Sequence, residues 1–147
     1  MAAVRRADVV WEGSLARGSG KVSASSSQAF SDLPVSWASR TERANGQTSP
    51  EELVAAAHAS CFAMALSAGL AKAGTPPKTL EVTSTVTFDK VGDDWTVVSS
   101  ALDVKGEVPN IDAAAFAKAA EGAKDGCPIS RALKNNVKLS VKSTLAP

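Results

Sequence analysis

Ser49-Pro50-Glu51-Glu52-Leu53 opens the stretch that decides the fold, an alanine-rich apolar run that continues to Lys72. The serine, the proline after it and the glutamate three residues on form a capping box with proline at the first helical position. Gly74 and Pro76-Pro77 follow the run, and both residue types end helices. The pattern predicts one long helix from Pro50 to about Lys72.

This helix is expected to be surrounded by protein, because both of its faces are small and apolar. One face is expected to carry Val54, Ala57, Cys61, Met64, Ala65 and Ala68. The run is also long enough to span a bilayer. It is mostly alanine and is interrupted by His58, Ser60 and Ser67, so we interpret it as a buried core helix of a protein that is not membrane-bound.

The segments on either side predict strands and shorter helices. Alternation around Val9 and Trp11 predicts a strand, and residues 21–25 predict its hairpin partner. Residues 26–47 are expected to be irregular, with breaks at Pro34 and Asn45-Gly46.

Beyond the long helix, alternation and turn residues predict a second hairpin. The expected elements there are strands at 80–88 and 95–105, helices at 113–124 and 127–133, and a last strand at 137–142. The order predicts one α+β domain over residues 1–147, with largely antiparallel sheets and the Ala-rich helix at its centre.

Charge and composition exclude several functions. The 147 residues carry a net charge of +1 without a basic run, which argues against nucleic-acid binding. The N-terminal residues lack the apolar region of a secretory signal, so a cytoplasmic location is expected. No Gly-x-Ser-x-Gly elbow or glycine-rich phosphate loop occurs.

Two cysteines are the candidates for redox chemistry. Cys127 precedes Pro128 at a predicted helix start, where backbone N–H groups favour a thiolate. Cys61 lies mid-helix, where a small buried hydrophobe is the ordinary interpretation. Together the two thiols suffice for a cycle in which one forms a sulfenic acid and the other traps it as a disulfide.

Two alternatives remain open. His58 and Cys61 are three residues apart on one helix, and with Cys127 they could form a Cys₂His metal site for a metal-binding protein or metal-assisted hydrolase. The cysteines could also be structural, in a binding module without catalytic activity. Analysis of bound metal and thiol titration after peroxide treatment separate these alternatives from a peroxidase.

The sequence resembles the OsmC/Ohr family, within it the OsmC branch. Three segments carry the resemblance: residues 49–66 with Cys61-Phe62 in the helix, Gly126-Cys127-Pro128 with the residues to Leu133, and Trp11-Glu12-Gly13 with residues 17–20. The resemblance covers nearly the whole chain. It implies an OsmC-like fold, an intertwined homodimer with active sites at the subunit interface, and peroxidase activity on organic hydroperoxides in the response to oxidative and osmotic stress, without a cofactor or metal.

The resemblance also assigns roles. Cys61 would be the peroxidatic cysteine, Cys127 the resolving cysteine, and Glu51 the catalytic glutamate. The family's arginine matches Arg40 in the OsmC branch and lies nearer Arg17 in the Ohr branch, and we favour Arg40. A lipoyl-type dithiol or a thioredoxin-like protein would be the reductant.

Helix geometry supports the homodimer. Glu51 and Cys61 are ten residues apart on one helix, about 15 Å along its axis. A glutamate at that distance does not position an arginine over the thiol of its own chain. Two such helices packed antiparallel would bring Glu51 of one subunit near Cys61 of the other.

Overall fold

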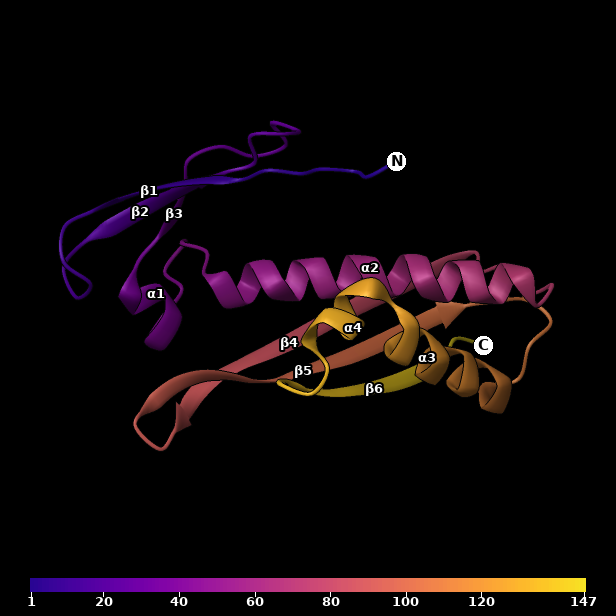
Figure 1. Ribbon diagram of the computed structural model, residues 1–147. Coiled ribbons are helices and arrows are strands. Elements are labelled where there is room, and N and C mark those ends of the chain that lie inside the picture. Colours follow the sequence, from indigo (N-terminus) through magenta and orange to yellow (C-terminus); the bar gives the residue numbers. More distant parts are fainter. The chain divides into compact units, whose positions relative to one another are not determined.

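The structure, a computed structural model, describes residues 1–147 and divides them into two compact units, residues 1–53 and residues 54–147 (Figure 1). Each unit contains a three-stranded sheet. The predicted α+β fold with largely antiparallel sheets is confirmed. That residues 1–147 form a single domain stays a prediction.

The first unit is a small antiparallel sheet followed by a short helix. Strands β1 (Asp8–Glu12) and β2 (Ser19–Ser23) form the predicted hairpin, and β3 (Leu33–Val35) pairs with β2. Helix α1 (Trp37–Thr41) follows. The expectation that residues 26–47 are irregular is therefore wrong for β3 and α1. Elements this short show little periodicity, so the alternation test does not detect them.

The long helix α2 (Pro50–Lys72) has the predicted bounds. At its start the Ser49 hydroxyl accepts a hydrogen bond of 3.1 Å from the Glu52 backbone N–H, which is one of the two hydrogen bonds of the predicted capping box. The second, from the Ser49 backbone N–H to the Glu52 carboxylate, is not formed. The Glu52 carboxylate accepts from the Thr48 hydroxyl at 2.7 Å. The glutamate therefore fixes the residue before the capping serine.

The second unit is a sheet in the order β4 (Thr79–Val91), β5 (Asp94–Glu107) and β6 (Lys138–Leu145). β4 and β5 form an antiparallel hairpin, whereas β6 is parallel to β5. Helices α3 (Ala113–Gly126) and α4 (Pro128–Leu133) connect β5 to β6 and supply the crossover that a parallel pair needs. All of these elements lie close to their predicted positions.

The core of the second unit lies between its sheet and its helices. Most of its buried residues come from three elements: Phe62, Leu66 and Leu70 of α2, Leu102 and Val104 of β5, and Phe116, Ala120 and Ala123 of α3. Val108 and Cys127 complete the cluster. Alternate residues of β5 point into this core from Ser100 onward. At Gly106 the strand passes so close to α3 that an added Cβ would lie 2.5 Å from Cζ of Phe116.

The buried face of α2 differs from the predicted one. His58, Phe62, Leu66 and Leu70 form the buried stripe, while Met64 is 69% exposed and Ala57 and Ala68 are exposed. The bulky side chains turn toward the sheet, and the alanines did not reveal this direction because they occur all around the helix. α2 is the one helix long and apolar enough to cross a membrane, but its buried stripe makes it the core helix of this unit.

Candidate active site

The two cysteines lie side by side in the second unit, although they are far apart in the sequence. Cys61 is half-buried on α2, and Cys127 is completely buried at the N-cap of α4. The Cys127 thiol lies close enough to the Cys61 thiol to raise its pKa, and neither cysteine is in a disulfide. This proximity is what a thiol needs in order to trap an oxidised neighbour as a disulfide.

The first turn of α4 presents backbone N–H groups to both sulfurs. The Ser130 N–H donates to Cys127 Sγ at 3.3 Å, and the Ile129 N–H lies close enough to Cys61 to lower the pKa of its thiol. The first N–H groups of a helix have no partner within the helix, so they are free to bind the sulfurs. Pro128, at the first helical position, has no backbone N–H to donate. The first N–H groups that can point toward the sulfurs are therefore those of the two residues after it.

Burial raises the pKa of the Cys61 thiol above its ordinary value. The Ile129 N–H and the charge of Arg131 act in the opposite direction, and the hydrogen bond and charge of Cys127 raise the pKa further. The net direction is upward, so the thiol is protonated near neutral pH in the single chain. Chemistry that requires a thiolate therefore needs another cation close to the sulfur.

Cys61 borders an apolar groove at the surface of the second unit. The groove is lined by Ala57, Ser60, Met64, Ala65, Pro128 and Ile129 as well as Cys61. No charged side chain is among them. The Cys61 sulfur thus faces apolar surroundings on its open side.

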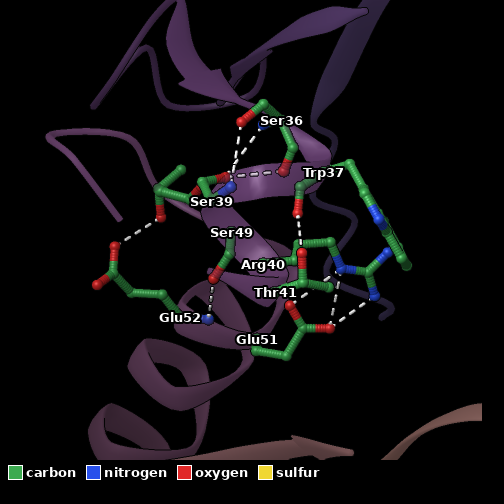
Figure 2. Close-up of polar contacts among 9 residues, drawn as sticks. Ser36, Trp37, Ser39, Arg40, Thr41, Ser49, Glu51 and Glu52 are labelled. Carbon is green, nitrogen blue, oxygen red and sulfur yellow. Dashed lines mark hydrogen bonds and ion pairs between the residues drawn. The ribbon is translucent and has the colours of Figure 1, made fainter. Parts of the chain in front are cut away.

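Arg40 and Glu51 form a close ion pair in the first unit (Figure 2). Arg40 Nη2 donates to Glu51 Oε1 at 2.6 Å, and Arg40 Nε donates to Oε2 at 3.1 Å. The Glu51 side chain is 8% exposed and that of Arg40 28%. A two-pronged pair of this kind fixes the plane of the guanidinium as well as its position.

α1 supplies Arg40 and also the aromatic ring that lies over it. The Arg40 Cζ is 5.7 Å from the centroid of the Trp37 ring, and the ring and the guanidinium are seen together in Figure 2. The Ser36 hydroxyl caps α1 by accepting from the Ser39 N–H at 3.1 Å. The cap holds the start of α1, and the ring packs on the guanidinium of Arg40.

A pocket of about 390 Å³ lies beside this ion pair within the first unit. Its lining is apolar except for Ser36 and Arg40: Val9, Trp11, Leu15, Val22, Val35, Trp37, Pro50 and Leu53. Arg40 is the only charged residue in this lining. Arg17, the alternative arginine, is exposed and does not line the pocket.

His58 is completely buried, and both of its ring nitrogens have hydroxyl partners. Nδ1 lies 2.6 Å from Ser100 Oγ, and Nε2 lies 2.8 Å from Ser130 Oγ. The chain contains no group of three His, Cys, Asp or Glu side chains arranged to hold a metal ion. The structure therefore does not support the alternative of a metal site formed by His58, Cys61 and Cys127.

Sequence reasoning missed Ser100 and Ser130. Ser130 lies three residues after Cys127, the position of the N–H that an N-cap side chain binds, so the local spacing could have suggested its proximity. Ser100 is one of several serines and threonines on two alternating strands. Nothing in the local sequence distinguishes it as the partner of a histidine on α2.

The family model described as OsmC-like protein matches residues 43–142. The chain is similar to proteins named Peroxiredoxin OsmC from Escherichia coli strain K12 and from Shigella flexneri. Each is 42% identical over 129 residues, which cover 88% of this chain and 89% of that protein. The range matched by the family model contains both cysteines, His58 and Glu51.

Solved structures share the fold at lower sequence identity. The organic hydroperoxide resistance protein OhrB of Bacillus subtilis aligns with a TM-score of 0.75 at 21% identity, over 95% of this chain and 98% of that one. An OsmC-like protein from Mycoplasma pneumoniae aligns with a TM-score of 0.75 at 14% identity, over 100% of both chains.

Proposed function

Since the chain belongs to the OsmC-like family, we propose that it is a thiol peroxidase that reduces organic hydroperoxides with Cys61 and Cys127. The similarity to proteins named peroxiredoxin supports a peroxidase role in stress defence. The observation that carries the two-cysteine mechanism is the pair of neighbouring, unbridged thiols at the start of α4.

In the first step the Cys61 thiolate attacks the distal oxygen of the hydroperoxide. The O–O bond breaks, Cys61 becomes a sulfenic acid, and the alkoxide takes a proton and leaves as an alcohol. In the second step the Cys127 sulfur attacks the Cys61 sulfur, a disulfide forms, and water leaves. A dithiol or a thioredoxin-like protein then reduces the disulfide by thiol–disulfide exchange.

Arg40 is proposed to supply the cation that lowers the Cys61 pKa, with Glu51 holding its guanidinium in place. A guanidinium stays charged in an apolar site and binds sulfur and carboxylate on different edges. Glu51 and Cys61 are both on α2, about 15 Å apart along its axis. We therefore propose that Arg40 and Glu51 of one subunit act on Cys61 of the other.

Exposed apolar surface supports the homodimer. All five residues of β1 are exposed, including Val9 at 59% and Val10 at 63%. Met64 on the open face of α2 is 69% exposed. Apolar surface of this extent on a single chain is typical of a protein–protein interface.

The pocket beside Arg40 is proposed to hold the alkyl group of the substrate. Its aromatic and aliphatic lining suits a bulky apolar group. Its single cation, Arg40, is proposed to face the peroxide oxygens. The protein is further proposed to act in the cytoplasm, without nucleic acid, membrane, metal or cofactor.

Thiol loss in a single turnover tests the proposal. The reduced protein is mixed with one equivalent of cumene hydroperoxide, and free thiols are counted over time. Wild type should lose both thiols quickly and form an intramolecular disulfide. Cys61→Ser should lose none, because the serine hydroxyl is not ionised near neutral pH.

Cys127→Ser is the matched variant. It should still react once at Cys61, and the sulfenic acid should then persist or proceed to sulfinic acid in excess peroxide, which mass spectrometry detects. Rapid reaction of Cys61→Ser combined with an inert Cys127→Ser would reverse the two roles. Thiols that survive in the wild type would show that the cysteines are structural.

A further inference from the structure

A buried chain of hydrogen bonds leads away from Cys127. The Cys127 thiol donates to Ser130 Oγ at 3.2 Å, and Ser130 Oγ lies 2.8 Å from His58 Nε2. On the other side of the ring, His58 Nδ1 lies 2.6 Å from Ser100 Oγ, which lies 2.9 Å from Ser84 Oγ. No step of the two-cysteine cycle described above uses these hydrogen bonds.

We propose that Ser130 and His58 form a proton relay that accepts the proton of Cys127 when this thiol attacks oxidised Cys61. The relay rests on the proposed two-cysteine function and adds two residues to its second step. Ser130 is a catalytic residue in this step because its hydroxyl touches the reacting sulfur. His58 is a positioning residue because it acts through Ser130.

The hydrogen-bond donors of this series can all point in the same direction, from Cys127 toward Ser100. The Cys127 S–H donates to Ser130 Oγ, so the Ser130 O–H is available to donate to His58 Nε2. Neutral His58 then carries its hydrogen on Nδ1 and donates it to Ser100. This order leaves Nε2 as the acceptor at the end of the path from the thiol.

Because these side chains are buried, the relay is the path open to the Cys127 proton. Cys127, His58 and Ser100 are 0% exposed and Ser130 is 1% exposed, so bulk water does not reach the Cys127 proton. Burial also lowers the pKa of His58, which keeps the imidazole neutral and able to accept a proton near neutral pH. The charges that act on Cys61 are those of Cys127 and Arg131.

The step balances in atoms and protons. The S–S bond forms as the S–O bond of the Cys61 sulfenic acid breaks. The Cys127 proton passes to Ser130, and the Ser130 proton passes to His58. The hydroxide that leaves Cys61 takes a proton from solvent at the open groove and becomes water. His58 returns to its neutral form by releasing the relayed proton to solvent through Ser100 and the half-buried Ser84, so the step consumes no net proton.

Single-turnover kinetics test the relay by separating the two steps. Reduced protein is mixed with cumene hydroperoxide, samples are quenched with an alkylating reagent, and mass spectrometry follows the sulfenic acid and the disulfide separately. The variants are His58→Gln, which does not accept a proton in this range, and Ser130→Ala, which removes the hydroxyl. Ser67→Ala on α2 is the matched control, because Ser67 is outside the chain of hydrogen bonds.

The expected result is a selective effect on the second step. Oxidation of Cys61 should be unchanged in all three variants, while disulfide formation should slow on the order of 100-fold in His58→Gln and Ser130→Ala, the range of general base catalysis. Disulfide formation in these two variants should also rise about tenfold per pH unit, because it then depends on thiolate already present. Wild type and Ser67→Ala should show a flatter profile near neutral pH.

Two results would overturn the relay. Disulfide formation as fast in Ser130→Ala as in Ser67→Ala would show that the thiol loses its proton by another route. Equal slowing of both steps in Ser130→Ala would show that the hydroxyl only supports the structure. Ser130→Ala decides the matter even if His58→Gln does not fold. Failure of wild type to oxidise Cys61 would instead refute the proposed function, and the relay with it.

Discussion

Replacing Arg40 by methionine should destabilise the protein and slow its chemistry for different reasons. Glu51 is 8% exposed at its side chain and accepts hydrogen bonds from two nitrogens of Arg40. Arg40→Met leaves this buried carboxylate without its cation. Removing one partner of a fully buried pair costs about 3–5 kcal/mol. Arg40 is 28% exposed, so we expect a smaller loss of about 2 kcal/mol, within the range of about 1–3 kcal/mol for an unsatisfied buried group.

The double variant Arg40→Met with Glu51→Leu separates stability from activity. Removing both charges leaves no buried carboxylate, so urea denaturation should show the double variant to be more stable than Arg40→Met alone. Oxidation of Cys61 should stay slow in both proteins, because neither has the guanidinium that is proposed to lower the Cys61 pKa. Arg17→Met is the control, since Arg17 is exposed and outside the pocket.

Two outcomes would refute this reasoning. Stability losses that add in the double variant would show that Arg40 and Glu51 do not depend on each other. Slow oxidation in Arg17→Met combined with normal oxidation in Arg40→Met would move the activating role to Arg17. The two-cysteine mechanism would survive that second outcome.

Three further predictions concern acid stability, substrate preference and packing. Because burial lowers the pKa of His58 from its ordinary value of 6.5, the unfolded chain binds a proton below that pH that the folded chain does not. The free energy of unfolding should therefore fall as the pH drops below 6.5. Urea titrations should show that this fall is smaller in His58→Gln than in wild type. Equal falls in the two proteins would contradict the prediction. Cumene hydroperoxide should have a higher kcat/KM than hydrogen peroxide, and Trp37→Ala should narrow the difference; a preference for hydrogen peroxide would count against the apolar pocket. Gly106→Ala should lower the free energy of unfolding by about 1–3 kcal/mol through overpacking, because its Cβ would meet Phe116. Gly122→Ala is the control, because nothing lies within 4 Å of its Cβ. Thermal unfolding should show no loss of stability in this control.

The sequence by itself determined the elements whose signals are local. The capping residues at Ser49 and the glycine and prolines after Lys72 set the bounds of α2, because helix ends depend on hydrogen bonds between residues three or four apart. Alternation predicted β4 and β5 in the same way, because successive side chains of a strand point to opposite faces. The two cysteines could be selected as redox candidates from the sequence because a cycle through a sulfenic acid and a disulfide requires two thiols.

Tertiary structure decided which of these residues meet. Which face of α2 is buried depended on the packing of Phe62, Leu66 and Leu70 against the sheet. The alanines around the helix did not indicate this face. The parallel pairing of β6 depended on the crossover through α3 and α4.

The sites depended on tertiary structure most of all. Cys61 meets Cys127, Arg40 meets Glu51, and His58 meets Ser100 and Ser130 through contacts between segments that are separated along the chain. Such contacts form only when burial of apolar surface brings the segments together, and no pattern within a few residues encodes them.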